Sequence, residues 1–346
     1  MKIPNLSTFK IFGLFLAMAV VFLSHTPVKA AGGADFDPGE LIMDHIADDY
    51  EWHFFTLGDF HATLYLPVMV YHSEQGFQVF SSKRFHEENP YNGYYYVHGE
   101  KLSRVDGSSF WDFSITKNVF SMLISAILML WIFLGIAGRY KQATYSAPKG
   151  LQSLMEPIIL FIQDEVVKPS IGKKYRTYLP YILSLFFFIW INNLLGLLPG
   201  AANATGNIAV TAALALIAMI VINVSATKDY WVHIFNTPGV PWWLKFPLPL
   251  MPVVEFIGVL TKPFALMVRL FANITAGHIL ILSVITIIFI LGKLSPAGGF
   301  GFSIVSVGFG LFLYALELLV AAVQAFIFSM LTAVFIGQAV EEHEHH

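Results

Sequence analysis

Five long runs of apolar residues follow residue 116, and polar side chains are rare inside them. The runs cover residues 118–138, 178–198, 207–227, 263–292 and 302–340. A helix rises about 1.5 Å per residue, so each run is long enough to cross the roughly 30 Å hydrocarbon layer of a membrane. This pattern predicts an all-α polytopic membrane protein with about five membrane-embedded helices.

The last two runs are too long to stand upright in a bilayer. Residues 263–292 would form a helix of roughly 45 Å, and residues 302–340 would form one of roughly 58 Å. A tilt of about 40°, the upper end of the usual range, does not fit the longer run into the hydrocarbon layer. We therefore expect a steeply inclined helical hairpin with its turn near residues 295–297. An upright bundle whose helix ends protrude is the alternative.

Folding the chain at this turn pairs the few polar residues of the two runs. Arg269 falls opposite Gln324, and His278 falls opposite Glu317, because the members of each pair lie at similar distances from the turn. Asn273 follows Arg269 by four residues and shares its helix face, whereas His278 is about half a rotation away. Arg269 and His278 are therefore expected to face different surroundings.

These residues suggest proton chemistry, because charges inside lipid need a reason to be there. Arg269 stays protonated and cannot carry a proton, but it can hold a carboxylate in its ionised form. His278 and Glu317 can accept and release protons near neutral pH. Two structural explanations stay open: Arg269, seven residues after Lys262, snorkels to the interface, or His278 and Glu317 form a purely structural pair.

The first 30 residues read as a secretory signal peptide. Lys2 and Lys10 supply the positive start, residues 11–23 the apolar core, and residues 28–30 small side chains before a cleavage point. An uncleaved first span is the alternative, although the apolar core is short for one. Cleavage would place the segment that follows outside the cytoplasm.

Residues 31–115 carry 14 Asp and Glu against 4 Lys and Arg. Their alternating aromatic stretches and their Gly, Asn and Pro turns predict a small, acidic, β-rich periplasmic domain. Six histidines without tight ligand spacing leave a metal site less favoured than ordinary packing: His45, His53, His61, His72, His86 and His98. The whole chain lacks cysteine, which excludes disulfides, thiolate metal sites and a cysteine nucleophile.

Basic residues predict the orientation. Arg139 and Lys141 follow the first span, and positively charged loops lie in the cytoplasm. Residues 151–167 have apolar positions at helical spacing, as in an amphipathic helix on the cytoplasmic membrane surface or against a partner. Asn192 and Asn193, near the outer end of the next span, either line a polar path or satisfy neighbouring helices.

Several strings resemble the sequence of subunit a of the F-type ATP synthase. RLFANITAGH spans residues 269–278, LELLVAAVQAFIFSMLTAVF spans residues 316–335, and NNLLGLLP begins at Asn192. Glu255 and Lys262 also fit the family. The resemblance covers roughly residues 116–340 and leaves out the acidic domain, for which it implies no role.

The resemblance implies a role for each polar residue of the hairpin. In the family, the residue that matches Arg269 faces a rotor ring of c subunits. Four further positions line or support the proton path: Asn273, His278, Glu317 and Gln324. Some bacterial members exchange the acid and the histidine, and this chain is similar to the mitochondrial type. Glu255 is the candidate for a cytoplasmic exit.

We therefore hypothesise a proton-conducting stator subunit in the cell inner membrane. Residues 116–340 would form two half-channels beside the c-ring, and residues 341–346 a short cytoplasmic tail. Expected partners are the c-ring, the subunit b stalk, other ATP synthase subunits and lipid, with no nucleic acid and no cofactor. The chain has no GxxxxGK[ST] loop, so it is not expected to make ATP itself. A secondary cation transporter, which predicts internally repeated halves, and a structural anchor are the alternatives.

Overall fold

A computed structural model describes residues 39, 46–57, 60–97, 101–142, 150–198, 202–235 and 250–341. The chain forms two compact units, which we describe separately. The N-terminal unit comprises residues 1–39 and 49–117, and the membrane unit comprises residues 40–48 and 118–346. The predicted signal peptide and residues 342–346 of the predicted tail lie outside the described residues.

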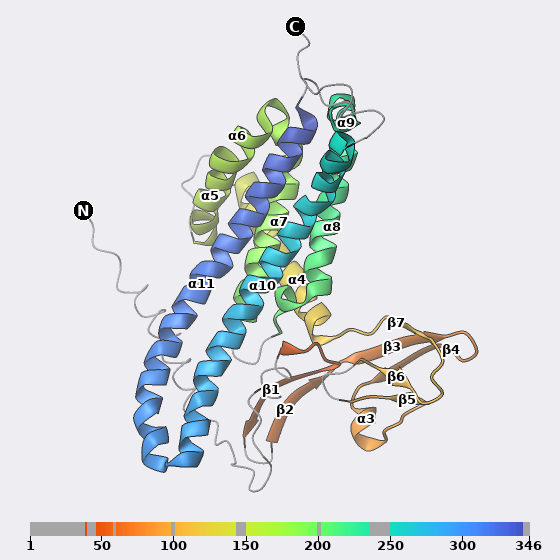
Figure 1. Cartoon of the computed structure of the whole chain (residues 1–346), viewed down its shortest axis with the longest axis vertical. Coiled ribbons are helices and arrows are strands. Elements are labelled where there is room, and N and C mark those ends of the chain that lie inside the picture. The colour runs from red at the N-terminus through yellow and green to blue at the C-terminus, as the bar shows by residue number, and fades with distance from the viewer. Residues whose placement is uncertain are drawn as a thin grey trace. The chain divides into compact units, whose positions relative to one another are not determined.

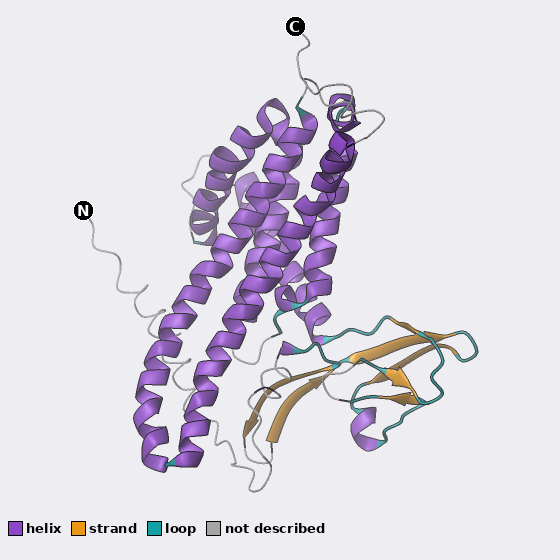
Figure 2. Ribbon diagram, viewed as in Figure 1, coloured by secondary structure: helices purple, strands orange, loops and turns teal. Residues whose placement is uncertain are grey.

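The N-terminal unit is built from short antiparallel strands, which confirms the β-rich prediction (Figures 1 and 2). One pair joins β1 (Glu51–Leu57) to β2 (Phe60–Tyr65). A three-stranded sheet has the order β4 (Gly76–Ser81), β3 (Pro67–His72), β7 (Trp111–Asp112). A second pair joins β5 (Tyr94–Tyr95) to β6 (Ser103–Arg104), and a short helix, α3, covers Arg84–Glu87.

Alternation along β3 determines which side of the sheet is core. Val68, Val70 and His72 are buried, whereas Tyr71 between them is exposed. The buried side packs against an aromatic cluster that includes Tyr94 of β5. Because strand side chains alternate between faces, the pattern of β3 buries one side of the sheet and exposes the other.

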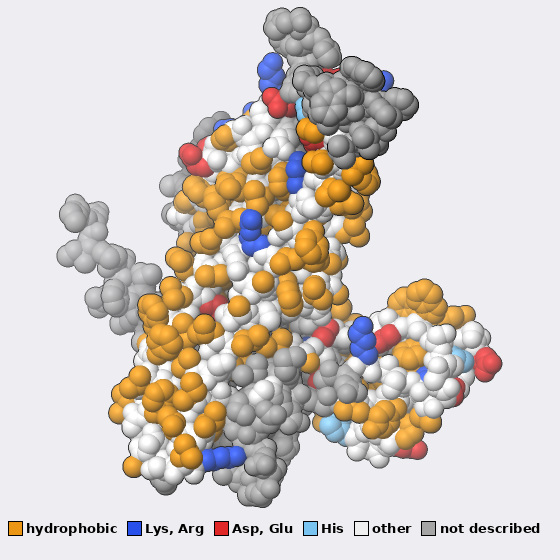
Figure 3. Space-filling view, viewed as in Figure 1, with side chains coloured by type: hydrophobic (Ala, Val, Ile, Leu, Met, Phe, Trp, Pro, Cys, Tyr) orange, Lys and Arg blue, Asp and Glu red, His pale blue; other side chains and the backbone are white. Residues whose placement is uncertain are grey.

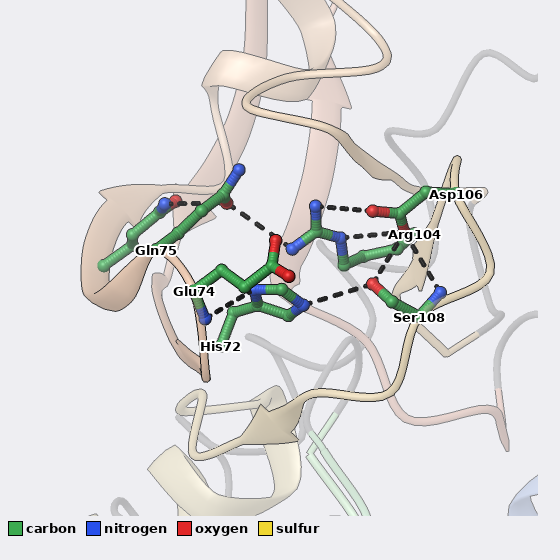
Figure 4. A network of polar contacts seen from close by, with 7 residues as sticks. His72, Glu74, Gln75, Arg104, Asp106 and Ser108 are labelled. Atoms are coloured by element: carbon green, nitrogen blue, oxygen red, sulfur yellow. Dashed lines mark hydrogen bonds and ion pairs between the residues drawn. The ribbon is translucent and has the colours of Figure 1, made fainter.

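A polar network ties the loop after β6 to the turn between β3 and β4 (Figure 4). Arg104 donates Nε and Nη2 to the two carboxylate oxygens of Asp106, at 3.0 and 2.8 Å. Ser108 donates its hydroxyl and its backbone N–H to Asp106 Oδ1. These bonds, first that of the Ser108 hydroxyl, lower the pKa of Asp106 from 3.8 to about 2. Their contribution to stability is present at neutral pH and is lost as the pH falls between these two values.

The histidines of this unit do not gather into a metal site in its described part. Among the described residues, no three His, Cys, Asp or Glu side chains group around a common point. His86 contacts Glu51, and His53 contacts Thr63. The side chains of His45, His61 and His98 lie outside the described residues.

Five helices of the described chain are long and apolar enough to cross a membrane, as predicted. The helical elements are α4 (Lys117–Gln142), α5 (Leu151–Phe161), a π-helix η1 (Ile162–Val167), α6 (Lys168–Ile171), a 3₁₀ turn η2 (Gly172–Lys174), α7 (Tyr175–Gly196), a 3₁₀ turn η3 (Ala204–Gly206), α8 (Ile208–Ser225), α9 (Lys228–Phe235), α10 (Leu250–Leu294) and α11 (Pro296–Val340). Apolar side chains cover much of the visible face of the helices (Figure 3).

The predicted amphipathic helix at 151–167 is α5 followed by the π-helix η1. Ile162 and Val166 are buried, whereas Leu154 is exposed. An apolar face that lies on a membrane surface is exposed in the protein alone, so the predicted place of this helix stays a prediction.

The hairpin of α10 and α11 is longer than predicted. Each helix has 45 residues and is roughly 68 Å long. The helix α10 begins at Leu250 and continues through Pro263, where the predicted run began. Ser295 caps α11 at the turn, where it accepts a hydrogen bond from the Gly298 N–H. The two helices lie side by side along their length (Figure 1). Their inclination to the membrane stays a prediction.

Candidate functional site

His278 and Glu317 meet across the hairpin, at the level that the sequence register predicts. His278 Nδ1 lies 2.6 Å from Glu317 Oε1, and both side chains are shielded, at 14% and 4% exposed. The other ring nitrogen, Nε2, lies 3.1 Å from the carbonyl oxygen of Gly196 at the end of α7. Three helices, α7, α10 and α11, therefore hold one imidazole.

The partners of His278 limit where its protons can sit. A carbonyl oxygen only accepts, so Nε2 carries a proton and donates it to Gly196. One further proton then lies in the short contact between Nδ1 and Glu317 Oε1. It belongs either to the imidazole or to the carboxyl group, so the pair shares one proton. Glu317 Oε2 is buried and has no hydrogen-bond partner among the described residues.

Gly277 makes room for this pair. A Cβ added at Gly277 would lie 2.9 Å from Glu317 Oε1, closer than real Cβ atoms approach such atoms. Sequence reasoning missed this residue. A glycine inside a helix costs about 1 kcal/mol relative to alanine, so one beside the histidine was a usable signal for a close approach.

Arg269 and Asn273 lie on a different side of α10. Both side chains are exposed, and neither makes a hydrogen bond or ion pair with another described residue. Gln324 of α11, predicted at the level of Arg269, is buried at 6% exposed. Gln324 is therefore buried and Arg269 is exposed, and their predicted place at one level of the hairpin stays a prediction.

Asn193 belongs to a polar chain that reaches the His278 pair. Its amide nitrogen donates to the Ala321 carbonyl of α11 at 3.1 Å, and its oxygen accepts from Thr205 Oγ1 at 2.7 Å. Thr205 also lies 3.3 Å from Asn203 Oδ1. Asn203 in turn packs against Gly196, where an added Cβ would be 3.2 Å from its Oδ1. Asn203 therefore adjoins Gly196, whose carbonyl oxygen accepts a hydrogen bond from His278.

Asp48 lies in a second polar cluster of the membrane unit. Asn207 caps α8 and donates its amide to Asp48 Oδ2 at 3.4 Å, and the Asn118 N–H donates to Asp48 Oδ1 at 3.2 Å. No motif marked Asp48, because it joins this region only through the fold. Asn192, by contrast, bonds Ser125 of α4 at 2.8 Å and ties two helices together.

Glu255 lies near the N-terminal end of α10, far from the pair of His278 and Glu317. It is 23 residues from His278, or roughly 34 Å along the helix. It lines a hollow of about 250 Å³ whose other lining residues are Asp229, Tyr230, His233, Ile234, Gly258, Val259, Lys262, Gln338 and Glu341. Lys262 Nζ donates to Gln338 Oε1 at 3.1 Å. Burial, and secondarily the charge of Glu255, raises the pKa of Tyr230 in α9.

Comparisons with known proteins agree with this arrangement. The sequence model of the ATP synthase A chain family matches residues 119–337, and a domain of unknown function (DUF8433) matches residues 41–118. ATP synthase subunit a of Chloroherpeton thalassium is 43% identical over 251 residues, which cover 70% of this chain and 72% of the relative.

A second relative also matches the N-terminal unit. ATP synthase subunit a 2 of Chlorobaculum tepidum is 37% identical over 322 residues, 91% of this chain and 77% of the relative. Subunit a of Myxococcus xanthus is 40% identical over 257 residues, 72% of this chain and 80% of the relative. The chain therefore belongs to the family of ATP synthase subunit a, the non-catalytic, proton-conducting stator subunit of the Fo sector.

Proposed function

We propose that protons cross the membrane through two offset half-channels that this chain forms beside a rotor ring of c subunits. The observation that carries the proposal is a contrast along α10. The shielded His278 and Glu317 share one proton, whereas Arg269, nine residues away, points outward without a partner among the described residues. One site can pass a proton on, and the other presents a permanent charge.

The inlet half-channel follows the polar chain of the membrane unit. A proton from the periplasm passes Thr205 and Asn193, which are hydrogen-bonded to each other, on its way to the pair of His278 and Glu317. Hydroxyl and amide groups can pass protons only together with water, which such a polar lining admits. The pair then delivers the proton to a carboxylate on the neighbouring ring.

Arg269 separates the two half-channels. Its guanidinium cannot lose its proton, so it conducts none and stabilises the ionised form of a ring carboxylate that comes near. The exposed Asn273 shares this face and adds a hydrogen-bonding amide. Gln324, which is buried on the neighbouring helix α11, adds a second amide to the hairpin. When rotation of the ring brings a protonated carboxyl group close to Arg269, that group therefore releases its proton into the outlet half-channel.

Glu255 supports the outlet. It lines the hollow near the end of α10, where Asp229, His233 and Lys262 add further titratable side chains. A water-filled hollow of this kind accepts the released proton on the cytoplasmic side. Each elementary charge that crosses the membrane releases about 2.3 kcal/mol per 100 mV, which the turning ring transmits.

The orientation and the partners follow from the same scheme. The N-terminal unit lies in the periplasm after removal of a signal peptide at 1–30, and the C-terminus lies in the cytoplasm of a cell with an inner membrane. The basic residues after the first span and after α5 favour this orientation. The c-ring contacts the exposed side of α10, and the subunit b stalk and the other ATP synthase subunits complete the stator.

Replacement of Arg269 tests the proposal. In Arg269→Ala, ATP-driven proton pumping in inverted membrane vesicles should be lost while the complex still assembles. Lys293→Ala removes a charge from the same helix, 24 residues away, and should leave pumping intact. Coupled pumping by the Arg269→Ala complex would overturn the proposal.

A further inference from the structure

One side of the three-stranded sheet in the N-terminal unit is both apolar and exposed. Across the strands, Tyr71 pairs with Phe77 and with Trp111, and Met69 pairs with Val79. Phe113 follows Trp111 by two residues on the same side, and their rings stack with centroids 6.5 Å apart. We call this surface the aromatic face; its members are Met69, Tyr71, Phe77, Val79, Trp111 and Phe113.

The aromatic face is not part of the core of its unit. The core lies on the opposite side of the sheet, where Val68 and Val70 pack with Tyr94. Five of the six side chains of the aromatic face are between 45% and 70% exposed. Soluble proteins rarely expose apolar side chains as one contiguous patch, and such a patch marks a surface that contacts a partner or a membrane.

The chain that leaves this sheet leads directly into a membrane helix. Beyond β7, backbone hydrogen bonds continue at alternate residues: Phe113 N–H to Met69 O, Ile115 N–H to Pro67 O, and Lys117 N–H to Asp49 O. Lys117 is also the first residue of α4, a candidate membrane span. The residue that ends this series of sheet hydrogen bonds is thus the residue that begins α4. Phe113 lies within about 13 Å of the start of α4, and Trp111 within about 20 Å.

We propose that the aromatic face lies in the headgroup layer of the membrane that α4 enters. Trp and Tyr side chains favour this layer, because their rings are apolar and their tips are polar. The surplus of acidic residues at 31–115 gives no attraction to anionic lipids, so the occupant is the apolar-to-polar boundary of zwitterionic lipids. The N-terminal unit then anchors the outer end of α4, a role independent of proton conduction.

Single-cysteine spin labelling tests this placement, since the natural chain has no cysteine. Trp111→Cys and Phe77→Cys place labels on the two outer strands of the sheet. Ser103→Cys is the matched control: Ser103 is exposed on β6 and points away from Tyr94 and the core. The labelled full chain, assembled in its ATP synthase, is reconstituted in phosphatidylethanolamine and phosphatidylcholine vesicles. Power saturation then compares the accessibility of each label to oxygen and to a water-soluble nickel complex.

The proposal expects both labels on the aromatic face to be more accessible to oxygen than to nickel, several times more so than the control. Addition of anionic lipid should not change the ratio. Equal ratios at all three positions would place the face in water and overturn the proposal. Low accessibility to both reagents at positions 77 and 111 would mean that protein covers the face, which also overturns it. Immersion at position 111 alone would show that only the tether nears the membrane, and it would exclude a face lying in the headgroup layer.

Discussion

Two histidines of this protein differ in the backbone group that holds their rings. A backbone N–H donates to His72 in the N-terminal unit, whereas a backbone carbonyl accepts from His278 in the hairpin. The Glu74 N–H donates to His72 Nδ1 at 3.3 Å, so the ring proton sits on Nε2 and points to Ser108 Oγ at 3.2 Å (Figure 4). Ser108 donates onward to Asp106. Each proton of this network has one place.

In the hairpin, the backbone group beside the histidine is an acceptor instead of a donor. A carbonyl holds His278 Nε2 as a donor, which leaves Nδ1 facing a carboxyl group rather than a hydroxyl group. In the N-terminal unit, the hydrogen bonds of Ser108 and then of Arg104 keep the pKa of the Asp106 carboxyl group low, whereas in the hairpin the partner of Glu317 among the described residues is His278 itself, which is a cation only when it holds the shared proton. Under the proposed function, the comparison teaches that a histidine becomes a proton relay through its second hydrogen-bond partner, not through burial alone.

Exchange of the two hairpin residues gives the largest expected effect and sharpens the comparison most. His278→Glu and Glu317→His, made singly, each replace the pair of an acid and an imidazole with two like groups, which hold a shared proton with a different affinity. Passive proton conduction should fall about 100-fold or more. The double exchange restores an imidazole facing a carboxyl group and should recover part of the conduction. Conduction is measured as the decay of a pH gradient in vesicles depleted of the catalytic sector.

Assembly of the complex, checked by immunoblot of the purified membranes, is the control for all three variants. If each single exchange conducts like the unchanged protein, the pair is structural and the comparison with His72 loses its meaning. A double variant that assembles but does not conduct protons would show that the two positions are not equivalent. Gly277 lies against Glu317, so a difference between the positions has a structural basis.

The sequence predicted the hairpin pair because helix periodicity is regular and the polar residues in it are few. Register placed His278 level with Glu317, and the structure joins them. The sequence could not predict that Gln324 is buried while Arg269 is exposed, because the hairpin register gives the level of a residue along the helix and not the direction of its side chain. Asn203 meets Gly196, and Asp48 meets Asn207, only through loops and helix ends, which follow no period.

Gly277→Ala should have the next largest effect, because the added Cβ would press on Glu317 Oε1. Overpacking costs about 1–3 kcal/mol, and a displaced carboxyl group should lower proton conduction about tenfold. Gly292→Ala on the same helix is the control, since its Cβ would meet nothing within 4 Å. Equal conduction in the two variants would show that the short contact between His278 and Glu317 is not needed for conduction.

His72→Gln should have the smallest effect, and it tests the comparison from the other side. The change disturbs two neutral hydrogen bonds, so the N-terminal unit should lose about 1 kcal/mol of stability. Limited proteolysis in increasing urea measures this loss, because cleavage follows the population of opened chains. His53→Gln, at an exposed position on β1, is the control and should change the cleavage less. ATP-driven pumping should be unchanged in both variants, because the network around His72 holds no mobile proton. A pumping defect in His72→Gln with intact assembly would mean that this histidine also serves proton transfer, and the distinction between the two histidines would fail.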